Sequence, residues 1–336
     1  MRNPARTGIG TFDTLPGRQH TDLSFRKGAN RLVYLIHGVT GTPVEMGYLG
    51  RYLSQQHRWD VYATTLPGHC TTLRNLVRTT QAEWRSHVQS QLSALRQQYE
   101  HLYVVGLSAG ALLALEASTV VEVDGVGVLS PTFQYDGWNT PWSHTLLPWA
   151  MKIVPLPLQQ FVFHLDGPPY GIKDKQLQAS VRKSYRPRVI LREWIEERWG
   201  RRKAGLAAMS FSPAASKGYP IFPLRTLTEI DGLMTYARTA LQNVTAPTVI
   251  LQAREDDMTG PRNASIVFEG ISSQEKQLVL LDDCYHVITV DKQREAVAKH
   301  VASFFQLHTK EATTRDKFER PPPTKRMSSA PEGSRF

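Results

Sequence analysis

Ser108 lies between Gly106 and Gly110 in the stretch VVGLSAG, residues 104–110. A serine hydroxyl is a poor nucleophile at neutral pH, so it needs a base and a third group that orients the base. The pattern Gly-x-Ser-x-Gly is weak by itself, and its alternative is a glycine-rich turn with an incidental serine. Here a run of apolar residues precedes it and the helix-forming run ALLALEAS follows it. Because a sharp turn from strand to helix exposes its central side chain, we expect Ser108 to be a nucleophile.

His286 is the best candidate for the base among the eleven histidines. It directly follows a predicted strand at 277–283, and ligands of parallel α/β sheets bind beyond the carboxyl ends of the strands. His101 precedes its strand, while His300 and His308 belong to a predicted terminal helix. A lone histidine is usually a packed or surface residue, so the prediction for His286 rests on its position.

The orienting acid is expected in REDDMTGP, residues 254–261, which follows another predicted strand and offers Glu255, Asp256 and Asp257. A carboxylate there would accept the Nδ1 proton of the imidazole and fix its tautomer. Acids after strands also serve as helix caps, and the residues alone leave the choice among the three open. The order serine, acid, histidine along the chain is that of the α/β-hydrolase architecture.

An oxyanion hole, a pair of backbone N–H groups that bind the negative charge formed on a carbonyl oxygen, has two candidate donors. The first is Ala109, directly after the serine. The second is Val39 in the loop HGVTGTP, residues 37–43, whose glycines allow close approach to a substrate. Each such donor is worth about 3 to 4 kcal/mol. His37 in the same loop is expected to be structural.

Short apolar runs alternate with helical patterns and must position these residues. Six runs rich in Val, Leu and Ile lack strict alternation, as strands buried on both faces do: residues 31–37, 59–65, 102–106, 125–130, 247–253 and 277–283. Between them, Trp84, Val88, Leu92 and Leu95 recur at helical spacing after a capping-box pair, Thr80 and Glu83. The alternation predicts an α/β fold with a doubly wound, mostly parallel sheet.

Five motifs in order resemble the bacterial carboxylesterase and monoacylglycerol lipase branch of the α/β-hydrolase superfamily: LIHGVTGTP, LPGHC, VVGLSAG, APTVILQAREDDMTGP and YHVITVD. That branch typically shows HGFTG, GHG, GLSLGG, ARxDxxxxP and GHVIxxD. The resemblance implies an α/β-hydrolase fold and ester hydrolysis without a cofactor or metal. It also selects Asp256 as the acid, because Arg254, Glu255 and Asp256 align with R-x-D.

The chain departs from the family pattern at three positions. Cys70 replaces the last glycine of GHG, Tyr285 replaces the glycine before the histidine, and Ala111 follows Gly110 where a second glycine is usual. None of these changes removes a catalytic atom. Tyr285 and Cys70 are expected to narrow the site and shift the range of substrates.

The sequence predicts four regions. Residues 1–29 are expected to form a flexible arm, 30–130 and 246–308 the hydrolase core, 131–245 a large helical cap insertion, and 309–336 a disordered tail. The first part of the cap is rich in large apolar residues, for which packing on the core, including an acyl pocket, is expected. Contact with a membrane surface is the alternative.

Composition and charge limit the possible partners. The net charge is +10, and residues 173–203 contain eleven basic and four acidic side chains. This basic cap segment, 173–203, would suit an anionic acyl carrier or a lipid surface, while a solvated helix is the plain alternative. The two cysteines are expected to be reduced. Neither a signal peptide nor an integral membrane segment is predicted, so we expect a cytoplasmic protein, and no motif indicates nucleic-acid binding.

The leading functional hypothesis is a serine hydrolase that cleaves small-molecule acyl esters through an acyl-enzyme on Ser108. The alternative is a thioesterase or acyltransferase that acts on acyl-CoA or an acyl carrier protein, motivated by the basic segment. A third hypothesis is a non-catalytic binding protein with a hydrolase fold. It is disfavoured because all three catalytic positions are occupied.

Overall fold

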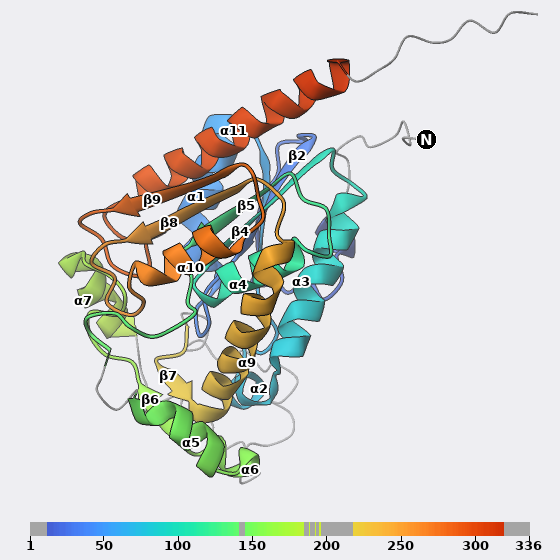
Figure 1. Cartoon of the computed structure of the whole chain (residues 1–336). Coiled ribbons are helices and arrows are strands. Elements are labelled where there is room, and N and C mark those ends of the chain that lie inside the picture. Colours follow the sequence, from blue (N-terminus) through green and yellow to red (C-terminus); the bar gives the residue numbers. More distant parts are fainter. Residues whose placement is uncertain are drawn as a thin grey trace, which may run out of the picture.

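A seven-stranded sheet forms the centre of the protein in a computed structural model that describes residues 12–140, 145–184, 188, 192, 195 and 218–318 (Figure 1). The strand order is β1-β3-β2-β4-β5-β8-β9. Only β1 is antiparallel to its neighbour, and the other six strands run parallel. Their bounds are Leu23–Phe25 (β1), Arg31–Ile36 (β2), Asp60–Thr64 (β3), His101–Leu107 (β4), Gly125–Leu129 (β5), Thr248–Ala253 (β8) and Lys276–Leu281 (β9).

The predicted doubly wound sheet is confirmed. All six predicted strands occur, with their ends within two residues of the expected positions. β3, β5 and β8 are buried along their whole length, and β2 and β4 at all but their first residue. Helices on both faces bury the strands, so their side chains need not alternate between apolar and polar.

Helices cover both faces of the sheet (Figure 1). Helices α1 (Gly47–His57) and α11 (Arg294–Phe318) pack on one face, and α3 (Gln81–Arg96), α4 (Ala109–Ala117), α9 (Leu224–Ala240) and α10 (Arg262–Gly270) on the other. Shorter elements are α2 (Leu73–Arg78) and the 3-10 turns η1 (Phe12–Thr14), η2 (Pro43–Met46) and η5 (Leu241–Asn243). The predicted capping box of Thr80 and Glu83 begins α3.

The interval between β5 and β8 holds α5 (Leu147–Ile153), α6 (Leu156–Gln159), β6 (Phe163–Leu165), α7 (Lys175–Ser184), β7 (Ile221–Pro223) and α9. β6 and β7 pair antiparallel in a second, small sheet. Buried side chains of α9, including Ile230, Leu233 and Ala237, join the same core as those of α4. Part of the segment predicted as a cap therefore belongs to the helical layer of the sheet.

The two ends of the chain differ from expectation where they are described. Phe12 and Leu15 are buried and β1 pairs with β3, so the prediction of a flexible arm is wrong for this part of 1–29. Helix α11 continues to Phe318, beyond the predicted start of the tail at 309. Residues 1–11 and 319–336 of the predicted arm and tail lie outside the described residues.

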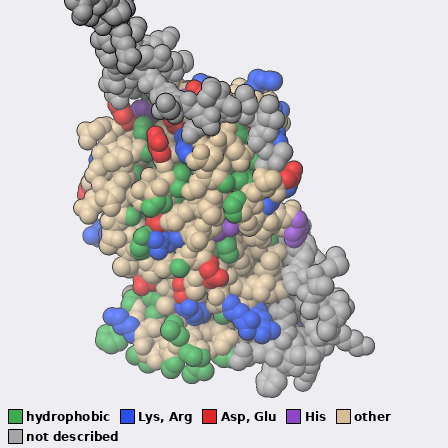
Figure 2. Space-filling model, turned by 90° about the vertical axis from the view of Figure 1, so that its right-hand side faces the viewer, with side chains coloured by type: hydrophobic (Ala, Val, Ile, Leu, Met, Phe, Trp, Pro, Cys, Tyr) green, Lys and Arg blue, Asp and Glu red, His purple; other side chains and the backbone are tan. Residues whose placement is uncertain are grey.

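Helices α5 and α6 carry large apolar side chains on their outer surface, where packing on the core was expected. Trp149 is 66% exposed and Ile153 70% exposed, and no residue of α5 is buried. Hydrophobic side chains also gather at the lower end of the face in Figure 2, the end at which Figure 1 places these helices. Within the described residues, no helix is long and apolar enough to span a membrane.

Candidate active site

Ser108 occupies the turn between β4 and α4 in a conformation that few residues adopt. Its φ of 58° and ψ of −121° are strained for a residue with a Cβ atom. The flanking glycines are required by close packing. A Cβ atom on Gly106 would lie 2.0 Å from the carbonyl oxygen of Gly110, and one on Gly110 would lie 2.5 Å from the carbonyl oxygen of Ile36. The turn is therefore a tight strand-to-helix connection that presents the Ser108 side chain above the sheet.

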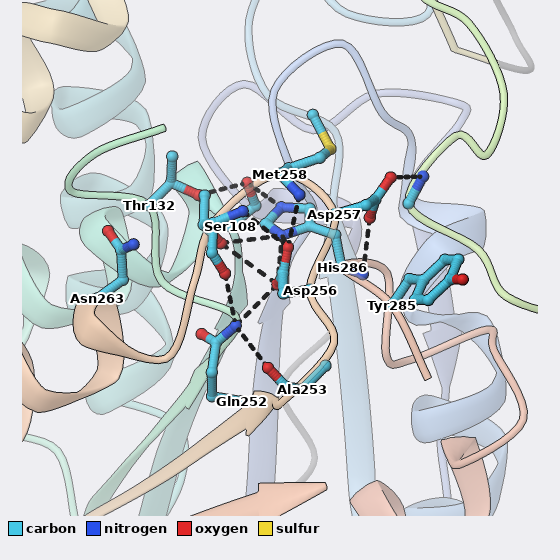
Figure 3. A network of polar contacts seen from close by, with 12 residues as sticks. Ser108, Thr132, Gln252, Ala253, Asp256, Asp257, Met258, Asn263, Tyr285 and His286 are labelled. Atoms are coloured by element: carbon cyan, nitrogen blue, oxygen red, sulfur yellow. Dashed lines mark hydrogen bonds and ion pairs between the residues drawn. The ribbon is translucent and has the colours of Figure 1, made fainter. Parts of the chain in front are cut away.

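The structure brings Ser108, His286 and Asp256 into one hydrogen-bonded line (Figure 3). The Ser108 Oγ atom is 3.0 Å from His286 Nε2. On the other side of the ring, His286 Nδ1 is 2.9 Å from Asp256 Oδ2 and 3.1 Å from Oδ1. All three residues are buried. A line of this kind can transfer a proton from the hydroxyl to the imidazole while the carboxylate fixes the tautomer.

The Asp256 carboxylate is held by neighbours that sequence reasoning missed. Asp256 Oδ1 accepts hydrogen bonds from the backbone N–H groups of Met258 (2.9 Å) and Thr259 (2.7 Å). Gln252 Nε2 donates to Oδ2 at 2.8 Å (Figure 3). Gln252 lies in β8 and interrupts a run of apolar residues there, which was the one available sequence signal. These contacts fix the carboxylate in the orientation that faces His286.

The two neighbouring acids take other positions. Glu255 is on the surface and pairs with Lys173 Nζ at 2.7 Å. Asp257 accepts hydrogen bonds from the backbone N–H groups of His286 (3.3 Å) and Gly171 (3.1 Å). Of the three acids, Asp256 is therefore the one that reaches the imidazole ring, and Asp257 supports the backbone around it.

The electrostatic environment raises the pKa of His286. Burial alone lowers the pKa of an imidazole, but the charge and hydrogen bond of Asp256 outweigh this effect, with smaller contributions from Asp257 and Glu45. The surroundings thus stabilise the imidazolium, which is the form that a base takes after accepting a proton.

Two neutral histidines hold the loop that contains Val39. His37 Nδ1 lies 2.7 Å from the carbonyl oxygen of Gly38, and its Nε2 accepts the backbone N–H of Leu66 at 3.1 Å. His69 Nε2 accepts the backbone N–H of Thr40 at 3.2 Å. Burial lowers the pKa of His69 to about 4 and that of His37 well below its usual range. His37 is therefore structural, as predicted.

A cavity of about 320 Å³ opens above Ser108. Val39, Ala109 and His286 line it together with Ser108. Helix α7 contributes one face, and the side chains on that face are Leu177, Ser180, Val181 and Ser184. The described residues that line the cavity are mostly apolar or uncharged, which suits an acyl chain.

Cys70 and Tyr285 do not narrow this cavity as expected, since neither is among the described residues that line it. Cys70 is buried at φ 55°, a left-handed conformation that explains why glycine is usual there. The Tyr285 ring packs against Trp138 with ring centroids 5.3 Å apart. The departures from the family pattern are thus accommodated outside the cavity.

The basic segment 173–203 is described only as far as residue 184 and at 188, 192 and 195. In the described part, Lys173 forms ion pairs with Glu255 and Asp283, so its charge is neutralised locally. Arg182 and Lys183 lie in the last turn of helix α7. The described residues include no group of three or more His, Cys, Asp or Glu that could hold a metal ion.

Comparisons with known proteins show which proteins this chain is similar to. A family described as serine aminopeptidase, S33, matches residues 27–293. A carboxylesterase of Bacillus subtilis (strain 168) is 25% identical over 281 residues, covering 83% of this chain and 94% of that protein. A thermostable monoacylglycerol lipase of Bacillus sp. (strain H-257) is 25% identical over 279 residues, covering 82% and 90%. The solved structure of a metagenome-derived lipolytic enzyme has a TM-score of 0.64 at 22% identity, covering 88% of this chain and 99% of that one.

Proposed function

We propose roles for three residues of this chain, which belongs to the serine aminopeptidase S33 family of hydrolases and has the α/β-hydrolase fold. Ser108 is the nucleophile, His286 the base and Asp256 the orienting acid. The protein is a serine hydrolase of carboxylic esters. The observation that carries the assignment of roles is the continuous line from Ser108 Oγ through His286 to Asp256, with distances of 3.0 and 2.9 Å.

The reaction runs in two halves. Ser108 Oγ attacks the ester carbonyl carbon while its proton passes to His286 Nε2. The bond to the alcohol oxygen then breaks, and the imidazolium returns the proton to the departing alcohol. Water attacks the acyl-enzyme in the same way, so that the acid is released and Ser108 is regenerated. Asp256 accepts the Nδ1 proton of His286 in a hydrogen bond throughout and stabilises the imidazolium.

The backbone N–H groups of Val39 and Ala109 are the proposed oxyanion donors. Both residues line the cavity beside Ser108, and Ala109 is the first residue of α4, where the helix dipole favours negative charge. A Cβ atom on Gly38 would lie 3.3 Å from the Ser108 Cβ atom. The loop backbone therefore lies directly against the nucleophile, as a donor to its tetrahedral intermediate must.

The substrate class that fits is an ester with an apolar acyl group. The named relatives are a carboxylesterase and a monoacylglycerol lipase, and the cavity is lined mainly by apolar and uncharged residues. A thioesterase or acyltransferase that acts on an anionic carrier is not favoured. The basic segment that motivated it lies largely outside the described residues, and Lys173 is already paired.

Labelling with a fluorophosphonate, combined with turnover of p-nitrophenyl esters of increasing chain length, tests the proposal. We expect labelling at Ser108, its loss in Ser108→Ala, and ester turnover well above that of acyl-CoA. Folded protein that hydrolyses esters without labelling at Ser108 would contradict the assignment of the nucleophile. A preference for acyl-CoA would contradict the substrate class.

A further inference from the structure

A second cavity, of about 250 Å³, adjoins the one above Ser108. Five residues line both cavities and so mark the junction between them: Tyr135, Asp166, Tyr170, Phe222 and Met258. This junction combines three aromatic rings with one carboxylate. Aromatic faces and a carboxylate together are the chemistry that recognises organic cations, above all quaternary ammonium groups.

The Asp166 carboxylate has capacity to bind a ligand. The one hydrogen bond that it accepts within the described part of the chain comes from the backbone N–H of Gly167, at 3.0 Å. Its own backbone is held by a hydrogen bond to the carbonyl oxygen of Pro220, next to β7. The carboxylate is therefore fixed in place directly after β6, where Asp166 lines both cavities.

Tyr170 is held at the junction in an unusual backbone conformation. Its φ is 61°, in the left-handed region that bulky residues rarely adopt. Its backbone N–H donates to the carbonyl oxygen of Gly167, and the next residue, Gly171, donates to Asp257. A turn that keeps a tyrosine in this conformation beside an incompletely bonded carboxylate indicates a built site, because such strain collects where a side chain has a role.

The charged side chains that line the two cavities are mainly acidic. Glu45 lines the catalytic cavity and Asp257 lines the second one, whereas neither cavity has a lysine or arginine among its described lining residues. The His286 imidazole and the His164 side chain are the titratable nitrogen groups there. Above pH 7, where Asp166 and Glu45 are ionised, a positive group on a substrate would meet attraction from both carboxylates, while the positive charge of Arg182 acts on Tyr170 from helix α7.

We propose that the junction formed by Tyr135, Asp166, Tyr170 and Phe222 binds an ammonium group of the ester substrate and makes the enzyme prefer cationic to isosteric neutral esters. The inference rests on the proposed ester hydrolysis. The junction adjoins the cavity above Ser108, so the test below distinguishes a cation on the alcohol part of the ester from one on the acyl part.

The pH dependence of the preference follows from Asp166. Burial raises the pKa of its carboxyl to about 7, with a contribution from the charge of Asp257. Other titratable groups that line the two cavities are Tyr135, Tyr170, His164, His286, Glu45 and Asp257, and the charge of Arg182 in α7 acts on Tyr170. Because only the ionised carboxylate attracts a cation, the preference is expected to grow between pH 6 and pH 8.

A matched pair of esters tests the proposal, namely butyrylcholine and 3,3-dimethylbutyl butyrate, which differ in charge and hardly in shape. We expect kcat/KM at pH 8 to favour the cationic ester by about 10-fold or more, and this ratio to fall toward one in Asp166→Asn. A pair with the cation in the acyl group, methyl 4-trimethylammoniobutyrate and methyl 5,5-dimethylhexanoate, distinguishes the two placements. Glu122→Gln, an exposed acid before β5, is the control and should keep the wild-type ratio.

A second measurement needs no variant. Tetramethylammonium should inhibit hydrolysis of the neutral ester competitively at pH 8 and several-fold more weakly at pH 6. The subsite alone would be overturned if the protein hydrolysed the neutral ester, if the kcat/KM ratios of cationic to neutral ester were near one for both pairs, and if tetramethylammonium did not inhibit. No turnover of any ester by folded protein would instead contradict the hydrolase function on which the subsite depends.

Discussion

The backbone N–H of Lys173 donates a 2.8 Å hydrogen bond to Asp291 Oδ2. The same oxygen accepts the backbone N–H of Tyr285, also at 2.8 Å, and the other carboxylate oxygen accepts the N–H groups of Asp174 and Lys292. Asp291 is fully buried. One carboxylate therefore fastens the start of the segment before α7 to the loop that carries the catalytic base.

Asp291→Asn should weaken the attachment between the segment before α7 and the loop that carries His286. The amide keeps one acceptor oxygen and turns an N–H group toward backbone donors, so we expect a loss of about 2 to 3 kcal/mol in the free energy of unfolding. Ester kcat/KM should fall as well, because the loop around His286 loses its anchor. Urea denaturation and ester kinetics measure the two effects, with the exposed Asp282→Asn as the control. Unchanged stability would show that the four hydrogen bonds are dispensable.

Asp256→Asn should change the pH profile as well as the rate. The pKa of His286 is raised by Asp256, and activity requires the neutral imidazole, so kcat/KM falls as the pH decreases through that pKa. Without the negative charge, this acid limb should move to lower pH. We also expect kcat to fall by about 10³- to 10⁴-fold, because the amide favours the wrong tautomer. If the acid limb of the pH profile did not shift in the folded variant, Asp256 would not be the residue that raises the pKa of the base.

Glu45 should make stability depend on pH near neutrality. Burial raises the pKa of its carboxyl to about 7, well above its value in the unfolded chain. A group of this kind stabilises the fold fully below its unfolded pKa, and that contribution is lost as the pH rises through 7. The change in the free energy of unfolding caused by Glu45→Gln should therefore be more stabilising at pH 8 than at pH 5, by about 1 to 3 kcal/mol. Thermal unfolding at the two pH values measures this, and equal shifts would contradict it.

The residues that the sequence singled out for the site lie together in the structure, and there is a physical reason for this. Ser108 directly follows β4, and Asp256 and His286 lie in the loops after β8 and β9, so chain position alone places them at one edge of the sheet. Gln252 lies only four residues before Asp256, but the direction of its side chain toward that carboxylate depends on the folded loop, and Asp166 lines a cavity wall formed by distant segments. Local patterns encode neither. β1 was missed because three residues are too few for a pattern. The exposed surface of α5 was missed because apolar content does not reveal which side of a helix faces solvent.

Gly106 offers a test of the turn that presents Ser108. In Gly106→Ala the new Cβ atom would overlap the Gly110 carbonyl oxygen, 2.0 Å away, and backbone atoms cannot yield as a flexible side chain can. We expect a loss of more than about 3 kcal/mol in stability, or a displaced Ser108 with ester kcat reduced at least about 100-fold. Gly232→Ala in α9 is the matched control, because the nearest atom to its Cβ would be 3.7 Å away and alanine favours a helix. Circular dichroism, denaturation and ester kinetics on both variants decide the matter: if Gly106→Ala were as stable and active as Gly232→Ala, the turn would not depend on the close contact between Gly106 and Gly110.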